Sequence, residues 1–268
     1  MKTNFQKNKI NQVYLAAAKV GGIHANNTYP AEFIYENLMI QSNIIHYAFL
    51  SGIKKLLFLG SSCIYPKESK TPIKEEYLMG GALEETHSAY AIAKIAGIEL
   101  IKSFRKEYGR TWISLMPTNL YGPNDNFELQ GSHVLPAFIR RFVEAAQNKV
   151  ATETLWGTGS PKREFLHVDD LAAAVVHLGS TYDSPLHLNI GTGEDLTIKA
   201  LAELVAELAG FEGEIAWDST KPDGTPRKVL DVTKAKSLGW APKISLRDGI
   251  ASTIAWYKDA SAKGVARR

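Results

Sequence analysis

The stretch HSAYAIAKIAG, from His87 to Gly97, places Tyr90 and Lys94 four residues apart. If this stretch is helical, the two side chains project from one face, one turn apart. A lysine ammonium close to a tyrosine stabilises the phenolate, lowers the tyrosine pKa and prepares the phenol to transfer a proton. The same spacing occurs by chance on many helices, where both side chains are solvated. The surrounding sequence has to distinguish the two interpretations.

Ser61, Ser62 and Cys63 follow a short apolar run and mark the place where a strand enters a loop. Serines at such places most often cap or turn the chain, and a buried cysteine behaves as a small apolar side chain. We keep that interpretation for Ser62. For Ser61 a second interpretation is open, because its hydroxyl and the Tyr90 phenol could contact the same carbonyl oxygen while the phenol delivers a proton.

The second half of the chain offers candidates that their residue types alone do not decide. His133 is one of seven histidines, and a lone histidine is usually structural or solvated. Arg140, Arg141 and Arg163 form either a solvated basic face or a pyrophosphate site, since guanidinium binds phosphate through a planar fork. Trp156, before a Gly-Thr-Gly turn, is either a core residue or a surface on which a base stacks.

The elements that must position these residues alternate between apolar strands and amphipathic helices. Such alternation predicts a doubly wound α/β fold, a parallel sheet with helices on both faces. Ligands of these sheets bind beyond the carboxyl ends of the strands, here in AAAKVGG, GSSCIYP and PTNLYGP. We expect strands in QVYLAAA, KKLLFLG and TWISLMPTNLYGP, and helices over 30–52 and 88–108.

After Pro123 the pattern changes, and we expect a smaller second unit. A helix in LPAFIRRFVEAA, a strand in ETLWGTGSP, a strand leading into a helix in REFLHVDDLAAAVVHLG and a strand in HLNIGTG are predicted. Thr197 is expected to cap a helix that stops at Gly210. The predicted boundaries are 1–123 and 163–192 for the sheet unit, and 124–162 and 193–268 for the second unit.

Composition restricts the class of protein. The chain of 268 residues has 45% apolar and 22% charged residues, as a globular protein does, and its net charge of +3 includes no basic run that would follow nucleic acid. No apolar run approaches the roughly 18 residues that span a bilayer. One cysteine excludes an internal disulfide and fits a reducing compartment. We expect a cytoplasmic protein without a metal site that binds neither nucleic acid nor membrane.

These residues resemble the GDP-L-fucose synthases of the extended short-chain dehydrogenase/reductase superfamily. The resemblance rests on Ser61, on Tyr90-x-x-x-Lys94 and on REFLHVDD (163–170). Cys63 is discriminating, because related sugar-nucleotide 4,6-dehydratases would have an Asp-Glu pair just after the catalytic hydroxyl residue. Longer matching runs span most of 12–240: AAAKVGGIHANNTYPAEFIYENLMIQSNII, LLFLGSSCIYP, YAIAKIAG, MPTNLYGPNDNF, SHVLPAFIRRF and KPDGTPRK.

The resemblance implies a two-stage reaction on GDP-4-keto-6-deoxy-D-mannose: epimerisation at C3 and C5, then reduction of the C4 ketone by NADPH to give GDP-L-fucose. Cys63 and His133 match the family's epimerisation acid/base pair, and both side chains exchange protons near neutral pH. Tyr90 matches the proton donor to the C4 oxygen, and Ser61 its hydrogen-bond partner. Lys94 matches the residue that holds the nicotinamide ribose and tunes the tyrosine.

The resemblance also implies binding residues and a partner. Family members pair as homodimers through helices that here correspond to about 33–50 and 88–108. The positions that match NADP(H) contacts are Leu59, Gly60, Ser61, Ser62, Tyr90, Lys94, Pro117, Thr118, Asn119, Leu120 and His133. The positions that match GDP-sugar contacts are Arg141, Trp156, Arg163 and Asp223.

The start of the chain departs from this family, whose members begin with a strand, a glycine-rich turn and a helix. Residues 1–11 are too few and too polar to supply them, and the glycines near Gly191 come too late for a phosphate-binding loop. We therefore expect an N-terminally truncated Rossmann-type sheet whose strand at Gln12 is an exposed edge. Without the turn that holds the pyrophosphate, NADPH should bind poorly or not at all.

Two other functions stay open. One is a different NAD(P)-dependent nucleotide-sugar epimerase, and the other is a non-catalytic remnant that binds a GDP-sugar through Arg141, Arg163 and Trp156. Uptake of solvent deuterium at C3 and C5, compared between the wild type and a Cys63→Ser variant, distinguishes them.

Overall fold

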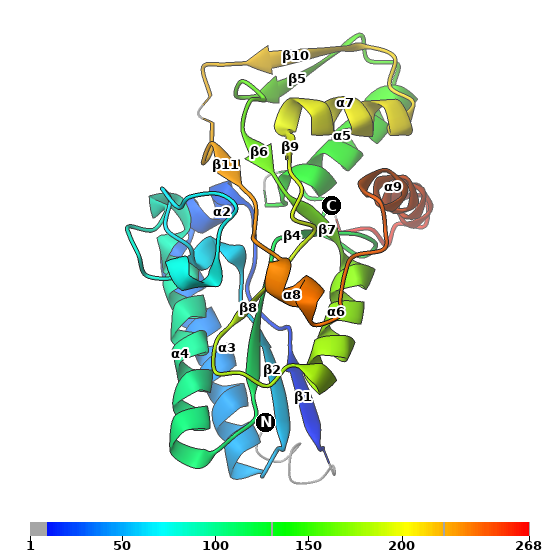
Figure 1. Ribbon diagram of the computed structural model, residues 1–268. Helices are drawn as coiled ribbons and strands as arrows, with labels where there is room; N and C mark the ends of the chain where they lie inside the picture. The colour runs from blue at the N-terminus through cyan, green and yellow to red at the C-terminus, as the bar shows by residue number, and fades with distance from the viewer. Residues whose placement is uncertain (1–9, 130, 222, 268) are drawn as a thin grey trace.

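A parallel sheet forms the framework of the lobe that contains the N-terminal half of the chain (Figure 1). The structure, a computed structural model, describes residues 10–129, 131–221 and 223–267. Within these residues the sheet has the order β1-β2-β3-β8 and every pair is parallel. The fold class predicted from the sequence is thereby confirmed. The strands are β1 (Gln12–Leu15), β2 (Lys55–Leu59), β3 (Ile113–Pro117) and β8 (Leu188–Ile190).

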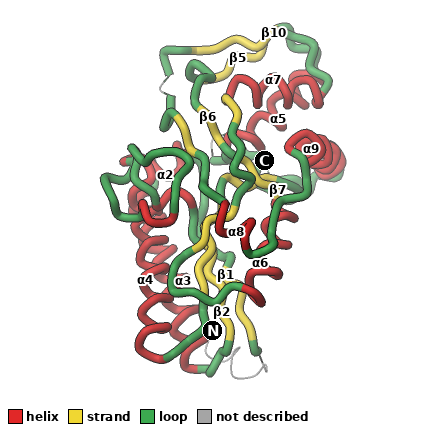
Figure 2. Tube along the Cα trace, in the orientation of Figure 1, coloured by secondary structure: helices red, strands yellow, loops and turns green. Residues whose placement is uncertain are grey.

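Helices cover both faces of the sheet, because the side chains of each strand alternate between two apolar cores. On β2, Leu56 and Phe58 belong to the core beneath α3 (Pro30–Leu50) and α4 (Ser88–Tyr108). Leu57 belongs to the opposite core, beneath α6 (Val168–Thr181). Figure 2 shows the strands between these helices. The helix predicted over 88–108 is confirmed at both ends.

Among the described residues, β1 is one edge strand of the four-stranded sheet and β8 is the other. β1 pairs with β2 from Gln12 opposite Lys55 onward, and Leu15 is its one buried residue. Tyr14 is 46% exposed. The predicted apolar strand is therefore shorter than QVYLAAA and mostly uncovered, since an edge strand lacks a neighbour on one side. The expectation that residues 1–9 add no strand lies outside the described residues.

The second lobe has a core of its own, formed between α5 (Val134–Gln147), α7 (Ile198–Ala209) and α9 (Leu246–Ala262). α7 begins as predicted, because the Oγ1 atom of Thr197 accepts a hydrogen bond of 3.0 Å from the backbone N–H of Ala200. It ends as predicted at Gly210, whose φ of 80° suits a residue without a side chain. A small parallel sheet completes this lobe, with β5 (Thr152–Trp156) beside β10 (Glu214–Asp218).

Short strands connect the two lobes. The sequence predicted one strand in TWISLMPTNLYGP, and this is wrong: the chain makes β3 and then β4 (Asn119–Tyr121). The break occurs because β3 pairs with β8 only as far as Pro117, after which β4 pairs with a different strand, β7 (Phe165–His167). Nearby, β6 (Lys162–Arg163) lies between β9 (Leu196–Thr197) and β11 (Arg227–Lys228).

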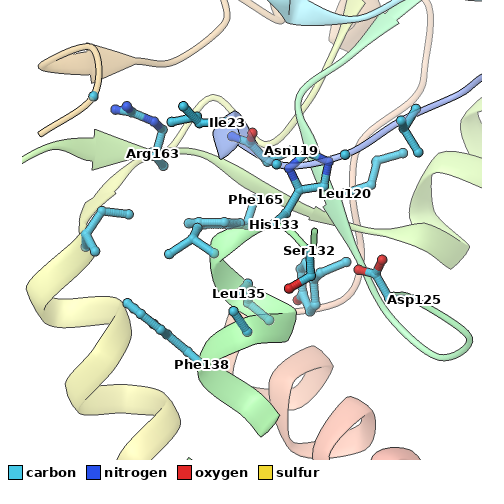
Figure 3. Close-up of a pocket in the computed structure, with 18 of the residues that line it drawn as sticks. Ile23, Asn119, Leu120, Asp125, Ser132, His133, Leu135, Phe138, Arg163 and Phe165 are labelled. Carbon is cyan, nitrogen blue, oxygen red and sulfur yellow. The ribbon is translucent and has the colours of Figure 1, made fainter. Parts of the chain in front are cut away.

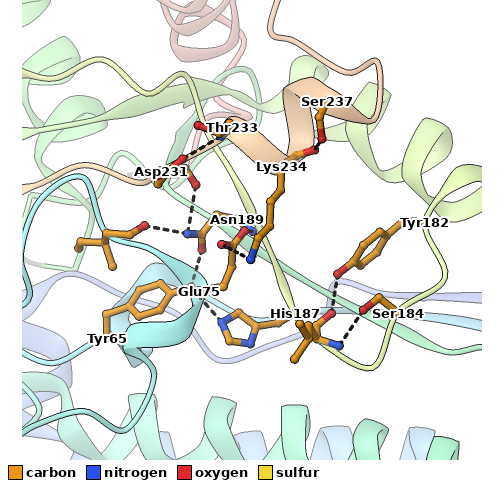
Figure 4. A network of polar contacts seen from close by, with 12 residues as sticks. Tyr65, Glu75, Tyr182, Ser184, His187, Asn189, Asp231, Thr233, Lys234 and Ser237 are labelled. Carbon is orange, nitrogen blue, oxygen red and sulfur yellow. Dashed lines mark hydrogen bonds and ion pairs between the residues drawn. The ribbon is translucent and has the colours of Figure 1, made fainter.

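A network of buried polar groups fastens the segment after β11 to the sheet lobe (Figure 4). The Nδ2 atom of Asn189, on β8, donates to the carbonyl oxygens of Ile73 (2.9 Å) and Asp231 (3.3 Å). Lys234, on α8 (Thr233–Ser237), pairs with the carboxylate of Glu75 at 3.0 Å. Residues 229–240 thus pack on the sheet lobe, although the predicted boundaries assign 193–268 to the second unit.

The remaining elements are short. No helix among the described residues is long and apolar enough to cross a membrane. The short elements are α2 (Ile23–Thr28) and the 3₁₀ turns η1 (Ser62–Ile64), η2 (Glu75–Tyr77) and η3 (Glu85–His87).

Candidate active site

A cleft of about 1530 Å³ lies between the lobes, at the carboxyl ends of β2 and β3. Figure 3 shows part of it, with His133 and Arg163 among the side chains that line it. Each site residue predicted from the sequence lines this one cleft, from both lobes. They are Leu59, Gly60, Ser61, Ser62, Cys63, Tyr90, Lys94, Pro117, Thr118, Asn119, Leu120, His133, Arg141, Trp156, Arg163 and Asp223.

The end of β2 presents Ser61 and Cys63 to the cleft. Ser61 is the N-cap of η1, and its Oγ atom accepts a hydrogen bond of 3.2 Å from the backbone N–H of Cys63. A Cβ atom at Gly60 would lie 2.3 Å from the Sδ atom of Met116, so only glycine lets β2 leave the sheet this close to β3. Ser62 is buried within the turn, as its interpretation as a turn residue predicts.

The first two turns of α4 hold Tyr90 and Lys94 against the sheet. Both are buried, at 9% and 3% exposure. The Nζ atom of Lys94 donates to the carbonyl oxygen of Leu59 at 2.9 Å and lies 5.8 Å from the centre of the Tyr90 ring. Burial lowers the pKa of Lys94 to about 8. The interpretation as two solvated side chains is therefore excluded.

The protonation of Tyr90 differs from the prediction. Burial and the nearby charge of Cys63 raise the pKa of Tyr90, and a hydrogen bond with Ser61 lowers it by less. The predicted lowering of the Tyr90 pKa by Lys94 is not seen in this structure, where burial is the largest influence on the phenol. Tyr90 consequently keeps its proton at neutral pH, which suits a group that donates one.

Cys63 has the opposite character. Burial raises the pKa of its thiol, but the Lys228 ammonium and the His87 imidazole outweigh burial and hold the pKa well below its usual range. The Nζ atom of Lys228 donates to Sγ at 3.5 Å. The sequence singled out neither neighbour, although Lys228 ends the run KPDGTPRK and His87 begins HSAYAIAKIAG. Because both residues lie in stretches that the sequence already marked as part of the site, they could have been identified as candidate neighbours of Cys63.

His133 enters the cleft from the other lobe. It is the exposed N-cap residue of α5. Asp125 also lines this wall (Figure 3). Burial raises the pKa of Asp125, while the backbone N–H of Asn126 and the charge of His133 lower it by less. A carboxylate thus lies close enough to His133 to interact with an imidazolium.

The arginines divide into two kinds. Arg140 does not line the cleft: its half-buried side chain pairs with Glu144 one turn away at 3.0 Å and donates to the carbonyl oxygen of Phe127 at 3.3 Å. The Nε atom of Arg141 donates to Glu153 at 2.6 Å. The Nη1 atom of Arg163 donates to the carbonyl oxygen of Thr225 at 2.6 Å. Arg141 and Arg163 are therefore the two that face the cleft.

Trp156 and Asp223 lie at the cleft mouth. Trp156 is 68% exposed, so the interpretation as a core residue is wrong, and the Nζ atom of Lys221 lies 5.6 Å from its ring centre. The carboxylate of Asp223 accepts hydrogen bonds from the backbone N–H (3.0 Å) and the hydroxyl (2.6 Å) of Thr158. An open indole face beside a fixed carboxylate suits a flat polar ring.

The walls at the sheet edge fit a nicotinamide ribose. Lys94 has three N–H donors and a single acceptor, Leu59, among the described residues, so donors remain for a ligand hydroxyl. Thr118 and Asn119 are fixed by donating to the carbonyl oxygen of the buried Glu164, at 3.3 and 2.8 Å. Within the described residues, no group of three or more His, Cys, Asp or Glu side chains could hold a metal ion.

The parallel sheet and the Ser61, Tyr90 and Lys94 side chains at its carboxyl edge define a Rossmann-type α/β protein with one large ligand cleft. A family model described as NAD dependent epimerase/dehydratase family matches residues 1–191. The chain is 60% identical over 253 residues to GDP-L-fucose synthase 1 of Arabidopsis thaliana, which covers 94% of this chain and 78% of that protein. It is 55% identical over 262 residues to GDP-L-fucose synthase of Escherichia coli K12, covering 94% and 82%.

Solved structures of two similar proteins have the same fold. The GDP-L-fucose synthetase from Naegleria fowleri bound to NADP superposes with a TM-score of 0.90 at 26% identity, covering 100% of this chain and 82% of that one. The GDP-6-OMe-4-keto-L-xylo-heptose reductase from C. jejuni superposes with a TM-score of 0.91 at 36% identity, covering 96% and 85%. The chain belongs to the NAD dependent epimerase/dehydratase family and, within it, to the GDP-L-fucose synthases.

Proposed function

We propose that the protein converts GDP-4-keto-6-deoxy-D-mannose into GDP-L-fucose, by epimerisation at C3 and C5 followed by NADPH-dependent reduction at C4. One observation carries the proposal: a cysteine whose sulfur lies 3.5 Å from the Lys228 ammonium, which favours a base, and a buried tyrosine, which favours an acid, line the same cleft. The first reaction needs a base and the second needs an acid. The names of similar relatives, GDP-L-fucose synthases, support this product.

Epimerisation uses the acidity that the C4 ketone gives to the C–H bonds at C3 and C5. The Cys63 thiolate removes one of these protons, and the electron pair moves onto the ketone as an enolate. Reprotonation of the carbon from the opposite side by His133 inverts its configuration. The step balances, because Cys63 takes one proton from the carbon and His133 gives another proton to the same carbon.

Reduction uses the groups at the sheet edge. NADPH, when bound, supplies the hydride for C4. Tyr90 donates its proton to the C4 oxygen, and Ser61 donates a hydrogen bond to the same oxygen. Lys94, held by the Leu59 carbonyl at 2.9 Å, binds the hydroxyls of the ribose. The raised pKa of Tyr90 suits this step because the phenol must carry a proton when the hydride arrives.

The two ends of the cleft bind the two nucleotides. Arg141 and Arg163 bind the diphosphate of the GDP-sugar through charge-assisted hydrogen bonds, Trp156 stacks on the base and Asp223 accepts its polar hydrogens. NADP(H) lies along the strand ends, at Leu59, Gly60, Ser61, Ser62, Pro117, Thr118, Asn119 and Leu120, with His133 at the far side.

We further propose a homodimer formed by α3 and α4. Tyr35 and Met39 on α3 are 65% and 44% exposed, and Ile92 on α4 is 47% exposed. Apolar side chains that remain uncovered on two adjacent helices favour a partner with the same surface. The single thiol, Cys63, suits a reducing compartment, and we propose a cytoplasmic location.

The test is incubation of the purified chain with GDP-4-keto-6-deoxy-D-mannose and NADPH in deuterated water. We expect deuterium at C3 and C5, which needs no NADPH, and slow NADPH oxidation to GDP-L-fucose at a high NADPH concentration, in line with the weak NADPH binding predicted from the sequence. A chain that binds the GDP-sugar but neither oxidises NADPH nor exchanges deuterium contradicts the proposal and favours a non-catalytic binding protein. Exchange at other carbons favours a different epimerase.

A further inference from the structure

The titratable groups around Cys63 come from four different elements. Lys228 reaches it from β11, with Nζ 3.5 Å from Sγ. His87, on η3, also acts to lower the pKa of Cys63. Arg163 on β6 and Tyr90 on α4 interact with the charge of Cys63 from further away. The nearby carboxylate of Glu84 is taken up by Lys67, at 3.2 Å.

Lys228 is held in place by its backbone. It pairs with Arg163 in the β11–β6 ladder. Two residues later, the backbone N–H of Leu230 donates to the carboxylate of Glu164 at 2.8 Å, and Glu164 is completely buried. Between them, the carbonyl oxygen of Val229 accepts from the backbone N–H of Ile73 at 2.8 Å. Because hydrogen bonds hold this segment on both sides, the direction of the Lys228 side chain is fixed. Its contact with Cys63 therefore belongs to the folded structure.

Cys63 is fixed equally well. Its own N–H is bound by Ser61, and the next residue, Ile64, is completely buried in the core beneath α3 and α4. The side chain itself is only partly buried and borders the cleft, where a substrate carbon can approach. Sγ therefore has a cationic neighbour, Lys228, that lines the same cleft.

We propose that Lys228 is a positioning residue that holds Cys63 as a thiolate, with His87 as a second partner. The inference rests on the proposed function, in which Cys63 is the base of the epimerisation. Lys228 keeps its proton throughout and accepts none from the substrate. When Cys63 removes a proton from carbon, the negative charge moves to the substrate enolate and the ion pair becomes an ammonium beside a neutral thiol.

The chemical benefit follows from the fraction of active base. An ordinary cysteine, with a pKa of about 8.5, is mostly protonated at neutral pH and is then no base. An opposite charge within about 4–6 Å lowers the pKa of an acid by about 1–3 units. A shift of about 2 units brings the thiol pKa below 7 and makes the thiolate the main form at neutral pH before any substrate binds.

The experiment titrates the thiolate by its ultraviolet absorbance and, separately, by its rate of alkylation with iodoacetamide. Cys63 is the single cysteine of the chain, so both signals report on it alone. We expect the Lys228→Met variant to raise the midpoint of the titration by about 1–3 pH units. Lys228→Arg should restore a midpoint close to that of the wild type, and His87→Gln should raise it by a smaller amount.

The matched control is Lys162→Met, which removes the same charge from the same small sheet. Lys162 pairs with Arg227 one position before Lys228, is exposed and does not line the cleft. Its titration should match that of the wild type. An unchanged midpoint in Lys228→Met, or an equal rise in Lys162→Met, overturns the inference.

Failure of the proposed function is separable from failure of the inference, because the titration needs neither substrate nor cofactor. A shifted midpoint in a protein without deuterium exchange removes the function and leaves the thiolate pair. Where exchange occurs, the pH at which it is half-maximal should rise in Lys228→Met together with the thiol midpoint. Exchange that keeps the wild-type pH dependence contradicts the role of Lys228.

Discussion

Two acidic side chains of one cleft, the Cys63 thiol and the Tyr90 phenol, differ in protonation because their neighbours differ. Cationic and imidazole side chains reach Cys63 and hold its pKa low in spite of burial. Tyr90 packs at right angles against Phe33, its ring centre 6.3 Å away, and burial raises its pKa. The difference teaches that the placement of charge, more than intrinsic acidity, separates the base from the acid.

The deprotonated state of Cys63 also stabilises the protonated state of Tyr90. The negative charge on Cys63 is one of the causes that raise the pKa of Tyr90. A deprotonated thiol therefore helps the phenol to keep its proton. The base of the first reaction and the acid of the second are both ready in the same resting protein, and no rearrangement between the stages is required of them.

The largest expected effect comes from removing the acid. Tyr90→Phe should lower the rate of NADPH oxidation by about 10²–10⁴-fold, the usual contribution of a general acid. Deuterium exchange at C3 and C5 should continue, because the Cys63 side of the cleft is unchanged. Stopped-flow absorbance for NADPH and mass spectrometry for exchange measure the two reactions separately. Equal loss of both reactions would show that the two sides do not act independently.

Removing the base should give the complementary result. Cys63→Ser should lower deuterium exchange by about 10²-fold, because a hydroxyl does not ionise near neutral pH. The reductase groups stay in place, so a substrate with the product configuration at C3 and C5 should still be reduced at a rate close to that of the wild type. Supplying that isomer to the variant and following NADPH is the measurement. Slow reduction of the isomer would contradict the division of roles.

Lys94 affects stability and activity in opposite directions. Folded Lys94 loses its proton near pH 8, whereas the unfolded side chain loses it near 10.5. Between these values the unfolded chain binds more protons, so the free energy of unfolding should rise with pH. Lys94→Met should abolish this rise and, at pH 7, stabilise the fold by about 1–3 kcal/mol while reduction is lost. Urea unfolding from pH 7 to 10.5 tests the prediction; a destabilised variant at pH 7 would contradict it.

Local patterns in the sequence predicted those parts of the fold that local interactions determine. α4 ends at Tyr108 because Gly109 adopts a left-handed conformation, with φ of 62°. The break between β3 and β4 was missed, because it depends on an exchange of pairing partners between distant strands.

The candidate site shows the same limit. The residues that the sequence singled out line one cleft, because strand ends and the following helix bring part of them together, and their roles stay predictions. The protonation states were not predictable. Lys228 lies 165 residues from Cys63 in the chain, and the carbonyl that holds Lys94 belongs to Leu59, 35 residues upstream. No local spacing encodes contacts of that range.

The smallest expected effect tests whether the Tyr90 side depends on the position of α4. A Cβ atom at Gly97 would lie 2.4 Å from the Phe58 ring and 2.9 Å from the Oε1 atom of Gln41. Gly97→Ala should push α4 away from β2 and lower the free energy of unfolding by about 1–3 kcal/mol. Reduction should fall more than deuterium exchange, because Tyr90 moves with α4 whereas Cys63 and Lys228 do not.

The control for this variant is Glu99→Ala, an exposed position on the same helix, which should change stability by less than about 0.5 kcal/mol. Thermal unfolding measures the change in stability, and the NADPH and deuterium assays measure reduction and exchange. If exchange falls as much as reduction in Gly97→Ala, α4 positions both sides of the cleft and the contrast between Cys63 and Tyr90 is electrostatic only. If reduction alone falls, the two groups are also mechanically separate, because the acid is carried by the helix and the base by the strand ends.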